Sequence, residues 1–228
     1  MLPLIATVLP LGIAAAIHPT LIAIQLLLVS QPYWWRRARA FAIGAALPLI
    51  SFGALAYFGF AQLPSGNPGT LNILGVSLRT MIGLGFLSGS VWLLWSHPRL
   101  QQRTSDFVTE KVRSGAPKDF LILGLLMNGK SVTTYALLVP ALHDISTVGQ
   151  PLPLKLLALA VLFGLALAPL WVPMVLAASL GSRGARRLQN MSDFVIANDF
   201  RLLGVMALVV GLYLTGSAAV LVAVVTHF

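Results

Sequence analysis

The sequence has no cysteine, few charged residues and very few acids. Without cysteine the chain forms no disulfide and no thiolate metal site. Charged residues make up 9% of the 228 residues, against about a quarter in a typical soluble domain. Hydrophobic residues take their place: they form 57% of the chain, and the mean hydropathy is +0.88. These proportions predict a protein that crosses a membrane several times.

The positions of the six acidic residues exclude several classes of function. A membrane site for a cationic substrate needs an intramembrane carboxylate, and aspartyl chemistry needs two. The sequence also lacks the His-Glu-x-x-His signature of zinc hydrolases. We therefore expect no cation site within the membrane, no enzymatic activity and no cofactor. The acids all fall in predicted loops or at the ends of predicted spans: Asp106, Glu110, Asp119, Asp144, Asp193 and Asp199.

Long apolar runs predict an all-α membrane protein with six transmembrane helices. The first run lacks the basic start and the small-residue cleavage site of a signal peptide, so we expect it to be retained as a span. No gap between the runs is long enough for a soluble catalytic domain. The predicted spans are Leu2–Ser30, Ala40–Leu63, Arg79–Ser96, Phe120–Leu142, Leu152–Leu180 and Leu202–Thr226.

The basic residues predict how these spans are oriented. Twelve of the fifteen Lys and Arg fall in gaps on one side of the membrane, and such an excess marks the cytoplasmic side. Both termini then lie outside. Topology therefore explains the net charge of +9 without nucleic-acid binding, and the cytoplasmic loops are expected to contact anionic lipid headgroups. The twelve are Arg36, Arg37, Arg39, Arg99, Arg103, Lys111, Arg113, Lys118, Arg183, Arg186, Arg187 and Arg201.

The fourth span contains a polar interruption near its middle. Asn128, Gly129, Lys130 and Ser131 stand within the run FLILGLLMNGKSVTTYALLVPAL. A lysine at the centre of a membrane helix costs roughly 2.5–3.5 kcal/mol on insertion scales. Glycine loosens the helix, and Asn and Ser satisfy backbone groups that a break sets free. The run therefore predicts a broken helix around a binding site.

The first span carries a similar interruption at the corresponding place. When LGIAAAIHPTLIAI is set over LGLLMNGKSVTTYA, the Leu-Gly pairs coincide, and His18 and Lys130 each stand six residues past the glycine. With three spans per half, the second half enters from the opposite face. The pattern thus predicts a 3+3 inverted repeat with broken helices one and four. We expect the first repeat in residues 1–97, a basic cytoplasmic linker in 98–118 and the second repeat in 119–228.

These interruptions supply the candidate substrate-binding site. Lys130 and His18 offer positive charge, and two half-helix N-termini add backbone N–H groups that favour anions. The predicted substrate therefore has a phosphate, sulfate or carboxylate group. Each residue also has a structural interpretation: the lysine snorkels, the histidine is hydrogen-bonded beside a proline kink, other polar side chains join helices, and Arg79 anchors a span at the interface. The candidates are His18, Pro19, Thr20, Gln25, Arg79, Asn128, Lys130, Ser131 and Thr134.

Three segments of the chain resemble the lysine-exporter (LysE) superfamily: HPTLIAIQLLLVSQP, AFAIGAALP and LLGVMALVVGLYL. Within it they are most similar to the GAP branch, the peptidoglycolipid-addressing proteins of actinobacteria. The resemblance implies a six-span exporter in the bacterial inner membrane that moves cell-envelope lipids outward. Amino-acid exporters of the superfamily typically have a Pro-Gly-Pro-type motif where this chain has Ile17-His18-Pro19-Thr20. This departure argues against amino-acid substrates.

Three functions are compatible with the sequence. The leading prediction is a transporter or flippase for an anionic amphiphile, such as an envelope lipid or a glycolipid precursor. The alternatives are a proton-coupled exporter of small anionic or zwitterionic solutes, amino acids among them, and a non-catalytic membrane partner of lipid-synthesis enzymes. A homodimer is compatible with all three. A lateral opening between helices would favour the lipid, whereas a closed polar cavity would favour small solutes.

Overall fold

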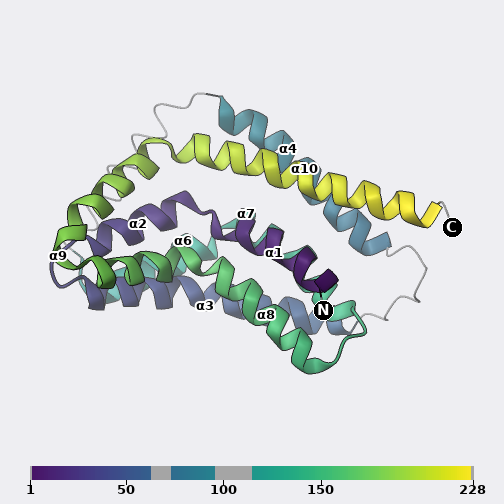
Figure 1. Cartoon of the computed structure of the whole chain (residues 1–228), viewed down its shortest axis with the longest axis horizontal. Helices are drawn as coiled ribbons and strands as arrows, with labels where there is room; N and C mark the ends of the chain where they lie inside the picture. The colour runs from purple at the N-terminus through teal and green to yellow at the C-terminus, as the bar shows by residue number, and fades with distance from the viewer. Residues whose placement is uncertain (1, 63–72, 96–114, 227–228) are drawn as a thin grey trace.

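The computed structural model describes residues 2–62, 73–95 and 115–226, and within these ranges every regular element is an α-helix (Figure 1). The first half of the chain forms α1 (Leu2–Ala16), α2 (Pro19–Val29), α3 (Trp34–Ala61) and α4 (Ile73–Leu94). The second half forms α6 (Pro117–Gly129), α7 (Val132–Thr147), α8 (Leu152–Ala166), α9 (Ala168–Ala197) and α10 (Asp199–Thr226). Most of the predicted linker, 98–118, lies outside the described residues, and its last two residues begin α6.

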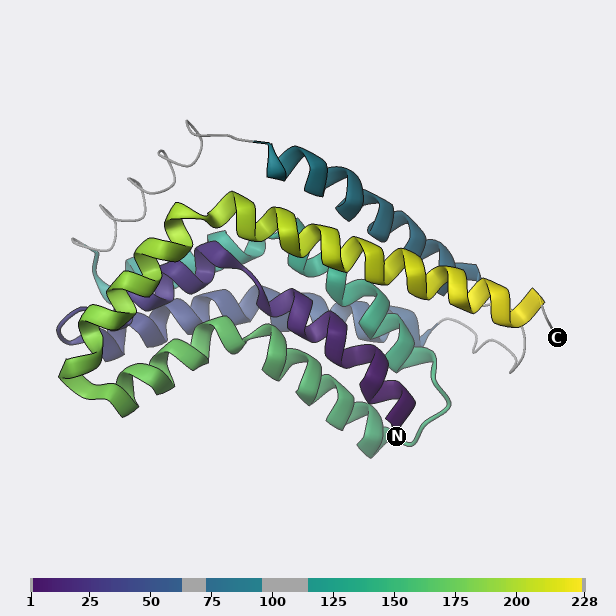
Figure 2. The ribbon, with the colours of Figure 1, turned by 45° about the horizontal axis from the view of Figure 1, so that its top comes forward.

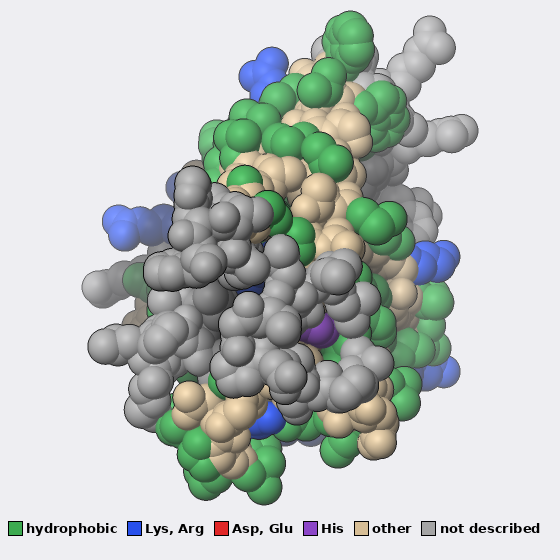
Figure 3. Space-filling view, turned by 90° about the vertical axis from the view of Figure 1, so that its right-hand side faces the viewer, with side chains coloured by type: hydrophobic (Ala, Val, Ile, Leu, Met, Phe, Trp, Pro, Cys, Tyr) green, Lys and Arg blue, Asp and Glu red, His purple; other side chains and the backbone are tan. Residues whose placement is uncertain are grey.

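The helices have the length and composition of membrane spans. Three single helices, α3, α4 and α10, are long and apolar enough to cross a bilayer. Three bent pairs, α1 with α2, α6 with α7 and α8 with α9, bring the number to six when each pair counts as one span. Large apolar side chains also cover the outside, as at Leu55, Met81 and Phe58. Hydrophobic side chains dominate the described surface in Figure 3, as expected for a helix bundle that faces lipid.

Spans one and four are broken, as the sequence predicts. The chain bends by 58° between α1 and α2, at Ile17 and His18. It bends by 63° between α6 and α7, at Lys130 and Ser131. A third bend of 66° separates α8 from α9 at Leu167, two residues before Pro169 (Figure 2). Proline cannot donate the helical hydrogen bond, which explains why this apolar run also bends there.

α9 contains a second sharp turn at Gly181, where the φ angle is +56°. Only glycine adopts such an angle without strain. The apolar part of the helix ends there, which agrees with the predicted end of span five at Leu180. The rest of α9 packs one face against α2, through the buried Leu188 and a hydrogen bond of 2.9 Å from Ser192 Oγ to the Ala23 carbonyl.

The core is divided at the level of the helix breaks. One cluster of buried apolar side chains comes chiefly from α1, α7, α8 and α10, and the other from α2, the first half of α3, α6 and α9. α4 and α10 pack mainly against each other and form a separate layer in Figure 1. Glycines allow their close approach: a Cβ on Gly211 would lie 3.0 Å from the Gly83 carbonyl oxygen.

Candidate functional site

The break in span one is held by side chains of the predicted site. His18 caps α2, because its Nδ1 accepts a hydrogen bond of 3.4 Å from the Leu21 N–H. Pro19 follows at the first helical position, where no N–H is needed. Thr20 Oγ1 donates to Asp199 Oδ2 at 3.2 Å and so joins α2 to the start of α10. These residues close the break and fix it beside α10.

Gln25, one turn further along α2, is fully buried. Its Nε2 donates to the Leu170 carbonyl at 2.8 Å and to the Ala38 carbonyl at 3.4 Å. The side chain therefore links α2 to α9 and α3. An amide with this role joins helices, which is the structural interpretation that the sequence left open.

The break in span four has its own set of hydrogen bonds. The buried Asn128 donates through Nδ2 to the Ala45 carbonyl of α3 at 2.6 Å. The hydroxyls of Ser131 and Thr134, also buried, are 2.7 Å apart. The Lys130 side chain stands at the break as predicted but is exposed on the protein surface. Within the described residues, no hydrogen bond or ion pair joins Lys130 to His18.

Arg79, for which the sequence suggested an interfacial anchor, has an ion-pair partner in the structure. α4 begins before Arg79, at Ile73, and the buried Arg79 side chain is ion-paired with Asp144. α7 continues to Thr147, past the predicted end of span four at Leu142. Asp144 therefore lies within a helix rather than in the following loop, and it neutralises the arginine.

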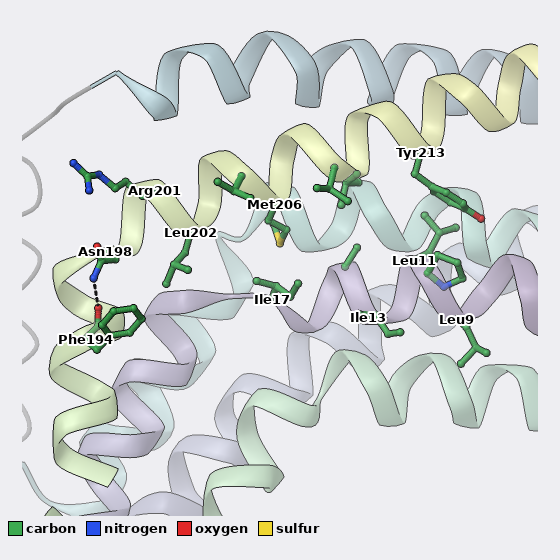
Figure 4. Close-up of a pocket in the computed structure, with 15 residues that line it drawn as sticks. Leu9, Leu11, Ile13, Ile17, Phe194, Asn198, Arg201, Leu202, Met206 and Tyr213 are labelled. Atoms are coloured by element: carbon green, nitrogen blue, oxygen red, sulfur yellow. Dashed lines mark hydrogen bonds between the residues drawn. The ribbon is translucent and has the colours of Figure 1, made fainter. Parts of the chain in front are cut away.

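An open groove lies between α1 and α10, at a place where sequence reasoning predicted no site (Figure 4). Its volume is about 700 Å³, and its walls are almost entirely apolar. The end of α9 closes it on one side. The lining residues are Leu9, Pro10, Leu11, Ile13, Ala14, Ile17, Phe194, Asn198, Arg201, Leu202, Val205, Met206, Val209, Val210 and Tyr213. No polar motif marks this groove in the sequence, because its lining resembles any lipid-facing helix.

The two ends of the groove differ in polarity. One end lies beside the break of span one, and Ile17 and Leu202 line it there (Figure 4). Arg201 is exposed there, and within the described part of the chain it has no ion-pair partner. Asn198 is nearby and donates to the Phe194 carbonyl at 2.9 Å. The opposite end is bordered by Leu9 and Tyr213, so a cation stands at one end of an otherwise apolar channel.

The comparisons with known proteins identify one family. A family model described as "Sap, sulfolipid-1-addressing protein" matches residues 8–220, which is most of the chain. No curated protein and no solved structure matches this sequence. The match confirms the predicted resemblance in part, because it is to a family of the lipid-addressing kind. Membership of the wider lysine-exporter superfamily stays a prediction.

Proposed function

The chain belongs to the sulfolipid-1-addressing protein family, and from this premise we propose that it transports an anionic amphiphile out of the inner membrane. In this proposal the acyl part of the substrate lies in the groove between α1 and α10, and the anionic headgroup binds at Arg201. The family name refers to a sulfolipid. For this chain we propose the broader class, a lipid or glycolipid precursor with a sulfate, phosphate or carboxylate.

The observation that carries the proposal is the lateral opening of the groove. Ile13, Val205 and Val209 line it and are all more than half exposed, so an acyl chain reaches it from the bilayer without crossing a polar barrier. From Arg201 to Tyr213, α10 rises about 18 Å at the usual 1.5 Å per residue. This covers more than half of a hydrocarbon core of about 30 Å. A small hydrophilic solute would instead need an enclosed polar cavity.

Selectivity in such a groove depends on the headgroup. An acyl chain leaves one apolar medium for another when it moves from the bilayer into the groove, so burial adds little free energy. Charge pairing at Arg201 does distinguish one lipid from another, because the guanidinium binds sulfate, phosphate and carboxylate oxygens in a bidentate manner. Among lipids with the same chains, an anionic one therefore binds better than a zwitterionic one.

The predicted orientation gives the groove a direction. From the positive charge on the loops we infer that the Arg201 end of the groove points toward the cytoplasm and the Tyr213 end toward the outside. The helix breaks of spans one and four then lie near mid-membrane, as in transporters built from inverted repeats. We propose that the headgroup enters at Arg201 and that the acyl chain follows the groove outward.

A matched pair of tryptophan variants tests the groove. Val209 lines it and Leu212 does not, although both stand on α10 with 60% and 59% exposure. Val209→Trp fills the groove, so we expect lipid translocation in reconstituted vesicles to fall at least tenfold. Leu212→Trp should translocate like the wild type. The assay follows a fluorescent anionic lipid whose outer-leaflet copies are quenched by dithionite.

Two outcomes would contradict the proposal. Equal translocation by both variants would show that the groove is not the lipid path. A wild-type protein that moves no anionic lipid but retains envelope-lipid synthesis enzymes in a stable complex would support the non-catalytic partner instead. Arg201→Gln, with Arg187→Gln as a control on exposed basic residues, separates the role of the headgroup site from general surface charge.

A further inference from the structure

Asp199 is a buried acid at the start of α10, beside the break of span one. Its side chain belongs to a residue that is 8% exposed. Oδ2 accepts a hydrogen bond of 3.2 Å from Thr20 Oγ1 on α2, whereas Oδ1 is buried and has no hydrogen-bond partner among the described residues. The carboxylate therefore belongs to the joint between α2 and α10, and one of its oxygens is left uncompensated.

The position of Asp199 in α10 suits a negative charge. It lies in the first turn of the helix, where the backbone N–H groups and the helix dipole stabilise an anion. The Thr20 hydroxyl adds one donor. In the described part of the chain no basic side chain forms an ion pair with Asp199. The field of this carboxylate is thus not cancelled by a direct partner.

The helices that pack against α10 bring few other charges to this end. α1 and α2 contain no charged residue. On α4, Arg79 is ion-paired with Asp144. The charged residues of α9 whose side chains the structure describes are exposed: Arg186, Arg187 and Asp193. Among the described residues, Arg201 is the cation nearest to Asp199 along the chain.

Asp199 and Arg201 flank the headgroup end of the groove from different depths. They are two residues apart in α10, which is about 3 Å along the helix axis, and side chains at this spacing do not face each other. Arg201 is exposed and lines the groove together with Asn198 (Figure 4). Asp199 is not part of the lining, because its side chain is buried against α2. A headgroup bound at Arg201 therefore lies within range of the Asp199 charge without touching it.

At this range the carboxylate acts through its electric field. Two unit charges about 10 Å apart, in a medium with an effective dielectric constant of about 20, change a binding constant roughly tenfold. Arg201 attracts each negative charge of a headgroup, and Asp199 repels each one. The guanidinium holds the first anionic group by bidentate hydrogen bonds. A second negative charge gains little from two residues with no net charge between them, and it still loses hydration on binding.

We propose that Asp199 makes the headgroup site selective for a single negative charge. The inference rests on the proposed function and narrows its substrate class to monoanionic amphiphiles, which are sulfate monoesters, phosphodiesters and carboxylates. Dianionic phosphate monoesters are disfavoured. Asp199 is then a specificity-determining residue that does not contact the substrate, and Thr20 keeps its carboxylate in place.

Two lipids that differ by one methyl group and one charge test this selectivity. Dioctanoyl phosphatidic acid is dianionic at pH 8.5, because a phosphate monoester loses its second proton near pH 6. Dioctanoyl phosphatidylmethanol is a phosphodiester with one charge. Their dissociation constants are measured on the purified full chain in a neutral detergent, at pH 8.5 and low salt, where screening is weakest. We expect the wild type to bind phosphatidylmethanol about threefold more tightly than phosphatidic acid, or better.

Variants assign this preference to the Asp199 charge. Asp199→Asn keeps the size of the side chain and an acceptor for Thr20, so we expect the preference to shift toward phosphatidic acid by about tenfold. Asp193→Asn removes an exposed carboxylate from α9 and should keep the wild-type preference. Thr20→Ala removes the hydrogen bond but leaves the charge, so any loss of affinity should be equal for the two lipids.

Two results would overturn the inference. One is the same lipid preference in the wild type and in Asp199→Asn, which would show that the acid only joins α2 to α10. The other is a wild-type protein that binds phosphatidic acid more tightly than phosphatidylmethanol, and this result does not depend on the folding of any variant.

The failure of this inference is distinct from that of the proposed function. If Val209→Trp blocks translocation but Asp199→Asn leaves the lipid preference unchanged, lipid transport stands and the charge selectivity fails. If Val209→Trp translocates lipid like the wild type, and the wild type binds neither short-chain lipid, the proposed function and the charge selectivity fail together.

Discussion

Single polar side chains at the helix breaks act first on the backbone. His18 accepts from the Leu21 N–H, Asn128 donates to the Ala45 carbonyl, and Gln25 joins three helices. In a bilayer each unsatisfied backbone group costs several kcal/mol, so broken spans need such partners. Lys130 differs from these residues because its side chain is exposed at the break. Among the residues that the structure describes, its side chain has no hydrogen-bond or ion-pair partner that would give it a comparable structural role.

Lys130→Met should therefore separate the effect of the lysine charge on transport from its effect on protein stability. The side chain keeps its length and loses a charge that is costly within the membrane, so the variant should be no less heat-stable than the wild type. Lipid translocation should fall sharply if the lysine attracts the anionic headgroup, and Lys130→Arg should restore part of it. Thermal stability in detergent and the vesicle assay measure the two effects. Lys118→Met, at another exposed lysine, is the matched control.

A Lys130→Met protein that is stable and fully active would remove Lys130 from the site. One that fails to insert would show that the lysine is structural after all. We expect a Lys130→Met protein that inserts normally but has lost lipid translocation.

Residue patterns predicted the two breaks but not the ion pair or the groove. Polar residues and proline inside apolar runs are a strong local signal, and His18 and Lys130 do stand at breaks. Asp144 falls just past the predicted end of span four at Leu142, but α7 continues to Thr147 and includes it. Asp144, the partner of Arg79, is 65 residues away along the sequence, and no pattern near either residue identifies the pair. The apolar groove has no signal at all, because lipid-facing and substrate-facing side chains are of the same kinds.

At the scale of elements, α3 and α6 approach until their backbones touch. A Cβ on Gly124 would lie 2.3 Å from the Phe41 carbonyl oxygen, which a side-chain movement cannot relieve. Gly124→Ala should therefore separate the two helices and cost about 1–3 kcal/mol of stability, as overpacking does. The control is Gly164→Ala on α8, where a Cβ meets nothing within 4 Å. Gly164→Ala should leave the free energy of unfolding unchanged or raise it slightly, because alanine favours a helix more than glycine does.

Thermal unfolding of purified variants in one detergent measures this difference. Equal melting temperatures for Gly124→Ala and Gly164→Ala would show that the close approach of α3 and α6 is not maintained. The same result would weaken any role of this contact in positioning the break at Lys130.

The pairing of helices is the one that an inverted repeat would produce. α3 packs along α6 and α7, while α8 and α9 pack along α1 and α2. Exchanging the two halves converts the first pairing into the second, and it leaves the α4–α10 contact in place. α1 and α7 of the first core cluster exchange with α6 and α2 of the second, whereas α4 and α10 both contribute to the first cluster. The repeat itself stays a prediction until the halves are superposed, and this packing favours it.

For the whole molecule, the direction of transport depends on which end of the groove faces the cytoplasm. α9, whose second half contains Arg186 and Arg187, lies at one end of the bundle, and the connection between α7 and α8 lies toward the other end (Figure 1). The positive-inside rule assigns the arginine-bearing end to the cytoplasm. With this assignment the Arg79–Asp144 ion pair, near the end of α7, faces the outside.

Cysteine labelling in intact cells tests this orientation. Gly149→Cys follows α7 and is exposed, so it should react with a thiol reagent that does not cross the membrane. Gln189→Cys, exposed on the arginine-rich part of α9, should react only after the cells are opened. The chain has no native cysteine, so background labelling is absent. The opposite labelling pattern would reverse the molecule in the membrane: Arg201 would then face outward, and the groove would lead substrate inward rather than toward the cell envelope.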